Sequence, residues 1–304
     1  MTGAIRATEE LEDLRRQIAR LERGVRSSSG VSGLSPSADR DGVPLGYAGI
    51  DARFQGGGAP FGVHEVSALA GAEASPALGF SLMMMARTLA RAPAGMGLII
   101  QPSAAAAENG ALYGPGLAAL GLPPGRLALV RVRSADQVLR VADEALRCGA
   151  VAAIVAEIWD ERPVDLSLTR RFNMSAQEHD VMTFLVTRQP SGTSAAMTRW
   201  IVGAAASEGE ITRARQRGLR RPRLGRPALQ LALTRNRRGS ASGWPLGEWQ
   251  VEWDGEQCCF KAPDRRADAG RPEWRGGGVA GSPGAAVPAP VAGPAGDRPD
   301  KAVA

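Results

Sequence analysis

Residues 64–86, "HEVSALAGAEASPALGFSLMMMA", have the layout of a phosphate-binding loop: a β-like run, a small-residue loop and an amphipathic helical run. In the P-loop pattern G-x-x-x-x-G-K-[ST], backbone N–H groups surround the phosphates, the lysine neutralises them and the hydroxyl binds Mg²⁺. Alignment on Gly71 places Pro76, Ala77 and Leu78 at the second glycine, the lysine and the hydroxyl positions. The pattern therefore predicts a degenerate loop without productive ATP hydrolysis.

Proline at position 76 has a structural explanation. It has no N–H to donate to a phosphate, but its fixed φ suits the first turn of a helix. We therefore predict that Ser75 is the N-cap and that Pro76 is the first residue of a helix. Weak binding of an anion or nucleotide at this helix N-terminus stays open as an alternative.

Other residue types with catalytic potential are isolated in the sequence. His64 and Glu65 are neighbours on a predicted strand, so they should face opposite sides of the sheet and not share a site. Cys258 and Cys259 are adjacent and have no partner at zinc-ligand spacing. Glu157 ends an apolar strand, where an ATPase keeps its Mg²⁺-binding acid, but it lacks the lysine and hydroxyl with which to act. We predict no catalytic residue, no metal site and no cofactor.

The remaining candidate function is binding, through a block of basic residues. Residues 211–240 contain ten arginines and no acid: Arg213, Arg215, Arg217, Arg220, Arg221, Arg223, Arg226, Arg235, Arg237 and Arg238. Such a block can contact several phosphates without reading sequence. Residues 201–243 hold no aromatic side chain on which bases could stack. A solvated loop and a docking surface for an acidic protein are equally open interpretations.

The elements that would position these residues alternate between strands and helices, which indicates a mainly parallel sheet covered by helices on both faces. Strands are predicted at 63–69, 97–101, 127–132, 150–158, 182–187, 199–205 and 228–233. Helices are predicted at about 77–91, 104–120, 134–148 and 167–179, the third capped by Ser134 and stopped by Gly149. "GEWQVEWDGEQCCFK" alternates around Asp254 and Gly255, so a terminal antiparallel hairpin is expected.

The two ends of the chain differ in amino-acid composition and patterning from the core predicted at 44–261. Residues 7–23 predict an amphipathic helix whose apolar stripe is Leu11, Leu14, Ile18 and Leu21. Residues 24–43 are rich in Ser and Gly, as in a flexible linker, and 211–226 form a basic insertion. Residues 262–304 are rich in Gly, Pro and Ala, which predicts a disordered tail.

Net charge, cysteine content and the distribution of apolar residues limit the partners and the cellular location to be expected. The net charge of +6 and the pI near 10.0 favour polyanionic partners without specifying them. Three cysteines form no disulfide framework, the N-terminal residues carry acids early, and no apolar run approaches a membrane span. We expect a cytoplasmic protein with no membrane partner.

Two stretches resemble the ImuA proteins, RecA-like and sometimes called SulA-like, of inducible mutagenesis cassettes. They are "GGGAPFGVHEVSALAG" (56–71) and "LYGPGLAALGLPPGRLALVRVRSADQVLRVADEALRCGAVAAIVAEI" (112–158), the second being more diagnostic. The order continues through 165–188, 194–207 and the strands that end the core. The resemblance implies a RecA-like, P-loop-NTPase-type α/β core with a degenerate phosphate loop. Glu157 then occupies a former metal-acid position.

The resemblance also implies a function in the DNA damage response. The expected partners are ImuB and an error-prone replicative-type DNA polymerase, in translesion synthesis, with non-specific DNA contacts as a further possibility. RecA relatives commonly assemble through an N-terminal helix, so residues 8–22 are expected to mediate self-association or partner docking. A divergent ATPase and a SulA-like, protein-binding inhibitor that does not contact DNA are the alternatives.

Overall fold

The computed structural model describes residues 42–69, 74–158, 164–189, 192–207, 225–238 and 246–263. Several predicted features lie outside the described residues: the N-terminal helix 7–23, the linker up to residue 41, Gly71, Arg213 to Arg223 in the basic insertion, and the tail from residue 264.

Within the described residues, nine strands form one sheet in the order β3-β2-β4-β5-β1-β6-β7-β8-β9. The strands are β1 (Gly62–Ala68), β2 (Met96–Pro102), β3 (Leu127–Val132), β4 (Val151–Ile158), β5 (Met182–Thr187), β6 (Thr198–Ala204), β7 (Ala228–Asn236), β8 (Glu248–Asp254) and β9 (Cys259–Lys261). Pairing is parallel from β3 to β6 and antiparallel from β6 to β9. The predicted α/β fold with a mainly parallel sheet and a terminal hairpin is confirmed.

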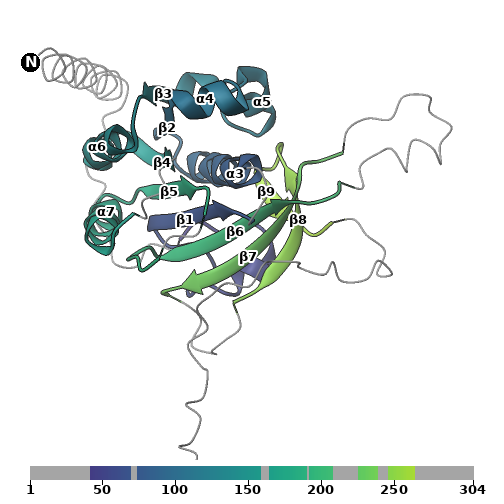
Figure 1. The fold of residues 1–304 in the computed structure, drawn as a ribbon. Coiled ribbons are helices and arrows are strands. Elements are labelled where there is room, and N and C mark those ends of the chain that lie inside the picture. Colours follow the sequence, from purple (N-terminus) through teal and green to yellow (C-terminus); the bar gives the residue numbers. More distant parts are fainter. Residues whose placement is uncertain are drawn as a thin grey trace, which may run out of the picture. The chain divides into compact units, whose positions relative to one another are not determined.

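Helices form the crossover connections between successive strands from β1 to β5, as parallel pairing requires, and α2 precedes β1. They are α2 (Ala48–Asp51), α3 (Ser75–Arg91), α4 (Ser103–Asn109), α5 (Gly114–Ala119), the 3₁₀ turn η1 (Pro124–Arg126), α6 (Ala135–Leu146) and α7 (Leu166–Glu178). Figure 1 shows α3 on one side of the parallel strands and α6 with α7 on the other. No described helix is long and apolar enough to span a bilayer.

Each face of the sheet has its own apolar core. The α3 face packs the helix against side chains such as Val66, Phe184 and Trp200, and aromatic rings from β8 and β9 extend it. The opposite face packs α6 and α7 against side chains such as Val63 and Leu185. Parallel strands covered on both faces are apolar throughout, which explains why their sequences lack strict alternation.

The prediction of one helix over 104–120 is wrong, because two short helices, α4 and α5, occupy this range. Gly110 ends α4 with φ +86°, a left-handed conformation that the helix cannot continue through. Pro115 then lies in the first turn of α5, where its missing N–H is not needed. Gly110 and Pro115 mark this break in the sequence, within a range that is otherwise rich in alanine.

Candidate functional site

The start of α3 holds the residues aligned with the phosphate loop. The helix begins at Ser75, and Ala74, at φ −71° and ψ −14°, is the N-cap without a side-chain capping bond. The prediction that Ser75 is the N-cap is therefore wrong: the backbone is already helical at Ala74, which places Ser75 in the first turn. Pro76 lies in that first turn, as predicted.

The two residues after Pro76 face the protein interior. Ala77 is fully buried and Leu78 packs against the α3-face core. At the positions where a phosphate loop carries a lysine and a hydroxyl, this chain therefore has apolar side chains, and residues 74–82 contain no Lys or Arg.

Glu157 lies at the carboxyl end of β4, beside Gln101 at the same end of β2. The two side chains are almost completely buried, and Gln101 Nε2 donates a hydrogen bond of 2.8 Å to Glu157 Oε1. Burial raises the pKa of the Glu157 carboxyl, and the hydrogen bond from Gln101 offsets part of that shift. Among the described residues, no group of three or more His, Cys, Asp or Glu side chains is placed to hold a metal ion. In this structure the Glu157 carboxyl is a buried group whose position is fixed by the hydrogen bond from the Gln101 amide.

His64 points to the α3 face, where both of its ring nitrogens are bonded. Nε2 lies 3.0 Å from the carbonyl of Pro60, so it carries the proton and donates. Nδ1 then accepts from the Thr198 hydroxyl at 2.7 Å, and that hydroxyl accepts from Trp200 Nε1 at 2.9 Å. The ring stacks on Phe184, and burial lowers its pKa to about 4. This arrangement favours a neutral, structural histidine.

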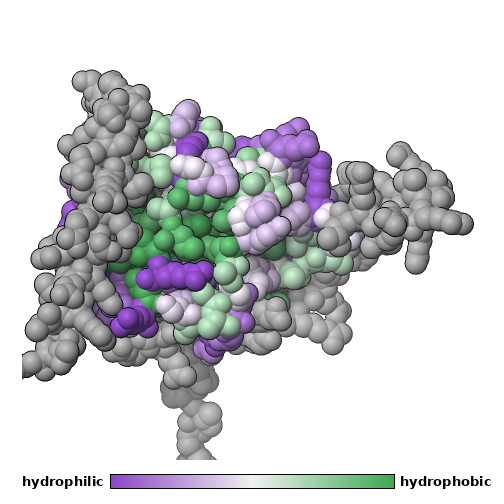
Figure 2. All heavy atoms as spheres, turned by 90° about the horizontal axis from the view of Figure 1, so that it is seen from above, coloured by the Kyte–Doolittle hydropathy of each residue, from purple (hydrophilic) through white to green (hydrophobic). Residues whose placement is uncertain are grey.

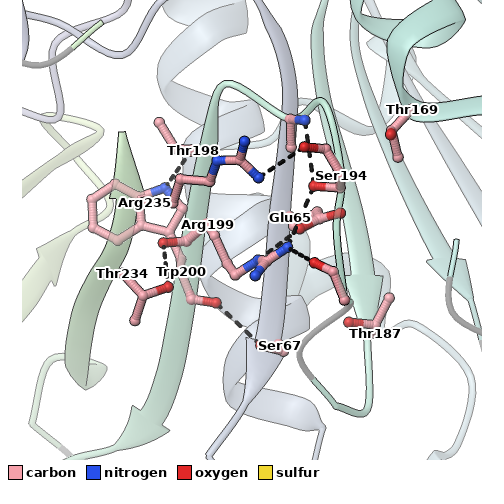
Figure 3. A network of polar contacts seen from close by, with 12 residues as sticks. Glu65, Ser67, Thr169, Thr187, Ser194, Thr198, Arg199, Trp200, Thr234 and Arg235 are labelled. Atoms are coloured by element: carbon pink, nitrogen blue, oxygen red, sulfur yellow. Dashed lines mark hydrogen bonds and ion pairs between the residues drawn. The ribbon is translucent and has the colours of Figure 1, made fainter. Parts of the chain in front are cut away.

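Glu65 points to the other face, as predicted from strand alternation, and begins a polar network (Figure 3). Its Oε2 accepts from Arg199 Nε at 2.8 Å, and the carboxylate is buried. Arg199 also donates to the Gly192 carbonyl at 2.6 Å. Arg235 donates to the Ser194 carbonyl at 2.8 Å. The network thereby ties residues 192–197 to β1, β6 and β7.

Sequence reasoning missed this network and the Gln101–Glu157 pair. A usable signal was present, since Glu65 and Arg199 are opposite charges inside strands predicted to be buried on both faces. Buried charges are paired, so such residues call for a partner. Which strands are neighbours, and hence which partner, was not readable from the sequence.

Four of the ten candidate arginines lie among the described residues, in two places. Arg226 is half exposed and lies 3.2 Å from Asp254, whose pKa is lowered first by a hydrogen bond from Lys261. Arg235 is the last residue but one of β7, and Arg237 and Arg238 follow directly after the strand.

The β7 end is a concentrated basic surface. Arg237 and Arg238 have exposed side chains, whereas Arg235 is partly buried against Ser194. Burial lowers the pKa of Arg235, and the charges of Arg237 and Arg199 add to that effect. We call Arg237 and Arg238 the β7 basic surface; it has the charge and exposure to bind a polyanion.

Two curated proteins are similar to this chain along most of their length. Both are called Protein ImuA, from Caulobacter vibrioides strains NA1000 / CB15N and ATCC 19089 / CIP 103742 / CB 15. Each is 32% identical over 223 residues, which cover 67% of this chain and 82% of the relative. No protein-family model matches the chain.

Among solved structures, SulA from Pseudomonas aeruginosa aligns with 20% identity and a TM-score of 0.33, covering 41% of this chain and 96% of SulA. A similarity of that size supports no inference about fold or function. The sequence similarity to the two relatives is extensive enough to assign a family. This chain belongs to the ImuA family.

Proposed function

We propose that this protein is a non-catalytic accessory protein of DNA damage-inducible mutagenesis. In this proposal it supports error-prone translesion synthesis by binding ImuB and an error-prone DNA polymerase, and it does not hydrolyse ATP. Membership of the ImuA family supports the biological setting.

The observation that carries the non-catalytic part is the start of α3. Phosphoryl transfer depends on cations and metal ligands that surround the phosphates. Here Pro76 removes a donor, Ala77 and Leu78 contribute apolar packing, and the carboxyl of Glu157 is bonded to Gln101. In this proposal the protein therefore acts by binding its partners through its surface and not by catalysis.

The first experiment tests binding and catalysis with the full-length protein. We expect co-purification with ImuB or the polymerase, together with neither calorimetric heat nor turnover on addition of Mg-ATP. Failure to retain either partner would contradict the accessory function. ATP turnover that is lost in Glu157→Gln would instead establish a divergent ATPase.

A second experiment tests whether the β7 basic surface contacts DNA. The double variant R237E/R238E should weaken retention on single-stranded or duplex DNA and flatten its salt dependence, because each lost phosphate contact removes about 0.7–0.9 from the log–log slope. R140E/R170E is the matched control, since it makes the same charge change at exposed sites on α6 and α7. Equal loss in both variants would indicate a general charge effect and no site at β7.

A further inference from the structure

The strand β3 forms one edge of the sheet and exposes apolar side chains. Within the described residues it pairs only with β2. Its sequence, LALVRV, is apolar except for Arg131, and Leu129 has 43% of its surface exposed. Figure 2, seen from the side of β3, α4 and α5, shows apolar residues gathered in the middle of this face. Edge strands of this kind are normally short, charged or covered.

We propose that residues 8–22 of the same chain cover the β3 edge. This segment carries the apolar stripe Leu11, Leu14, Ile18 and Leu21, which needs an apolar surface to bury against. As a helix, residues 11–21 would span about 15 Å. Side chains alternate along β3, so Leu129 shares a face with Leu127, which packs against the α3-face core. Leu129 is therefore the exposed apolar side chain of β3 that the stripe covers.

Charge fixes the direction in which the segment lies. Its first half is acidic, with Glu9, Glu10, Glu12 and Asp13. The carboxyl end of β3 is basic, with exposed Arg131 and Arg133. At 100° per residue Glu10 flanks the apolar stripe, whereas Glu9, Glu12 and Asp13 lie on the far side of the helix. Glu10 is therefore the carboxylate that reaches these arginines, and with it there the helix runs antiparallel to β3 and residue 22 lies near the amino end of the strand.

The connection to the rest of the chain agrees with that direction. Val43 pairs with Ala59, just before β1, and so enters the fold at the amino edge of the parallel strands. Four strand spacings separate β3 from β1, about 19 Å. The Ser/Gly-rich residues 23–41 predict a coil with a root-mean-square span of about 24 Å. A linker whose length matches the span gives a millimolar effective concentration, which favours the chain's own segment over that of a second copy.

The test uses the full-length protein with the photo-crosslinker p-benzoylphenylalanine in place of Leu129. Cross-links to residues 8–22 should form within a single chain, with a yield independent of protein concentration. Leu166, 46% exposed on α7, is the control position and should give at least about tenfold less of this product.

Two glutamate variants separate the apolar stripe from the segment as a whole. At 100° per residue, Arg16 lies opposite the stripe. Ile18→Glu should abolish the cross-link and speed hydrogen exchange in residues 127–133 by about tenfold or more, whereas Arg16→Glu should change neither. Equal yields from positions 129 and 166, or equal behaviour of the two glutamate variants, would overturn the proposal. A product of twice the chain mass that grows with concentration would overturn it as well, by placing the segment on a neighbouring copy.

Discussion

Acidification should destabilise this protein through one buried side chain, His64. In the folded chain its two nitrogens are bonded to Pro60 and Thr198, and burial holds its pKa at about 4, below the ordinary value of 6.5. In the unfolded chain the same ring binds a proton with that ordinary pKa. As the pH falls below 6.5, protonation therefore favours the unfolded chain, and the loss of stability is complete near pH 4.

The magnitude follows from the two pKa values. A difference of about 2.5 units corresponds to about 3 kcal/mol when the pH has passed below both values. Between pH 7 and pH 5 the His64 contribution to the free energy of unfolding should fall by about 2 kcal/mol. Burial raises the pKa values of the partly buried Asp51 and the buried Glu157, so these two groups act in the opposite direction as the pH falls.

The variant His64→Gln isolates the histidine, because all other titrating groups remain in it. The glutamine amide can still donate to the Pro60 carbonyl, but it does not titrate. We would measure urea unfolding by tryptophan fluorescence for both proteins at pH 7 and pH 5. The wild type should lose about 2 kcal/mol more than the variant over this interval. Equal losses in the two proteins would refute the assignment of a neutral, buried His64.

Three further variants test other parts of the structure by the same unfolding measurement. Arg199→Ala should lower the free energy of unfolding by about 3 kcal/mol or more, because Glu65 is left buried without its cation. Arg199→Lys should lower it by less. An Arg199→Ala variant as stable as the wild type would contradict the buried ion pair. Glu157→Gln should leave stability at pH 7 unchanged or raise it by about 1 kcal/mol, since the new amide can donate to the unpartnered Gln101 Oε1. That advantage should shrink as the pH falls and the wild-type carboxyl protonates, and destabilisation at pH 7 would argue for an ionised Glu157 with an unrecognised partner. Ser134→Ala should cost about 1 kcal/mol by removing the α6 cap, and an unchanged midpoint would show that the cap contributes nothing.

Most of the sheet could be predicted because its strands are buried on both faces. The run 182–187 is buried along nearly its whole length, and its predicted bounds coincide with β5. The bounds predicted for 127–132 coincide with β3, an edge strand that is apolar except for Arg131. The Asp254–Gly255 turn marked the β8–β9 hairpin, and Ser134 marked the start of α6. These signals are local, so neighbouring residues are enough to produce them.

Two local predictions failed. The range 104–120 is rich in alanine, but it also holds Gly110 and the run Gly114–Pro115–Gly116, and these poor helix formers mark the division into α4 and α5 that the prediction overlooked. Ser75 resembles an N-cap in sequence, but helical geometry begins one residue earlier, at Ala74.

The sequence by itself determined the α/β class, the loss of the phosphate-loop side chains at positions 76–78, and the opposite orientations of His64 and Glu65. Each depends on residue type and on a fixed local geometry. Only the tertiary structure decided that Glu65 pairs with Arg199, 134 positions away, and that Gln101 meets Glu157, 56 positions away. It also decided that the apolar strand β3 lies at an edge, where Leu129 is exposed. The order of strands in a sheet depends on how helices cross over between them, and no single strand's sequence records that order.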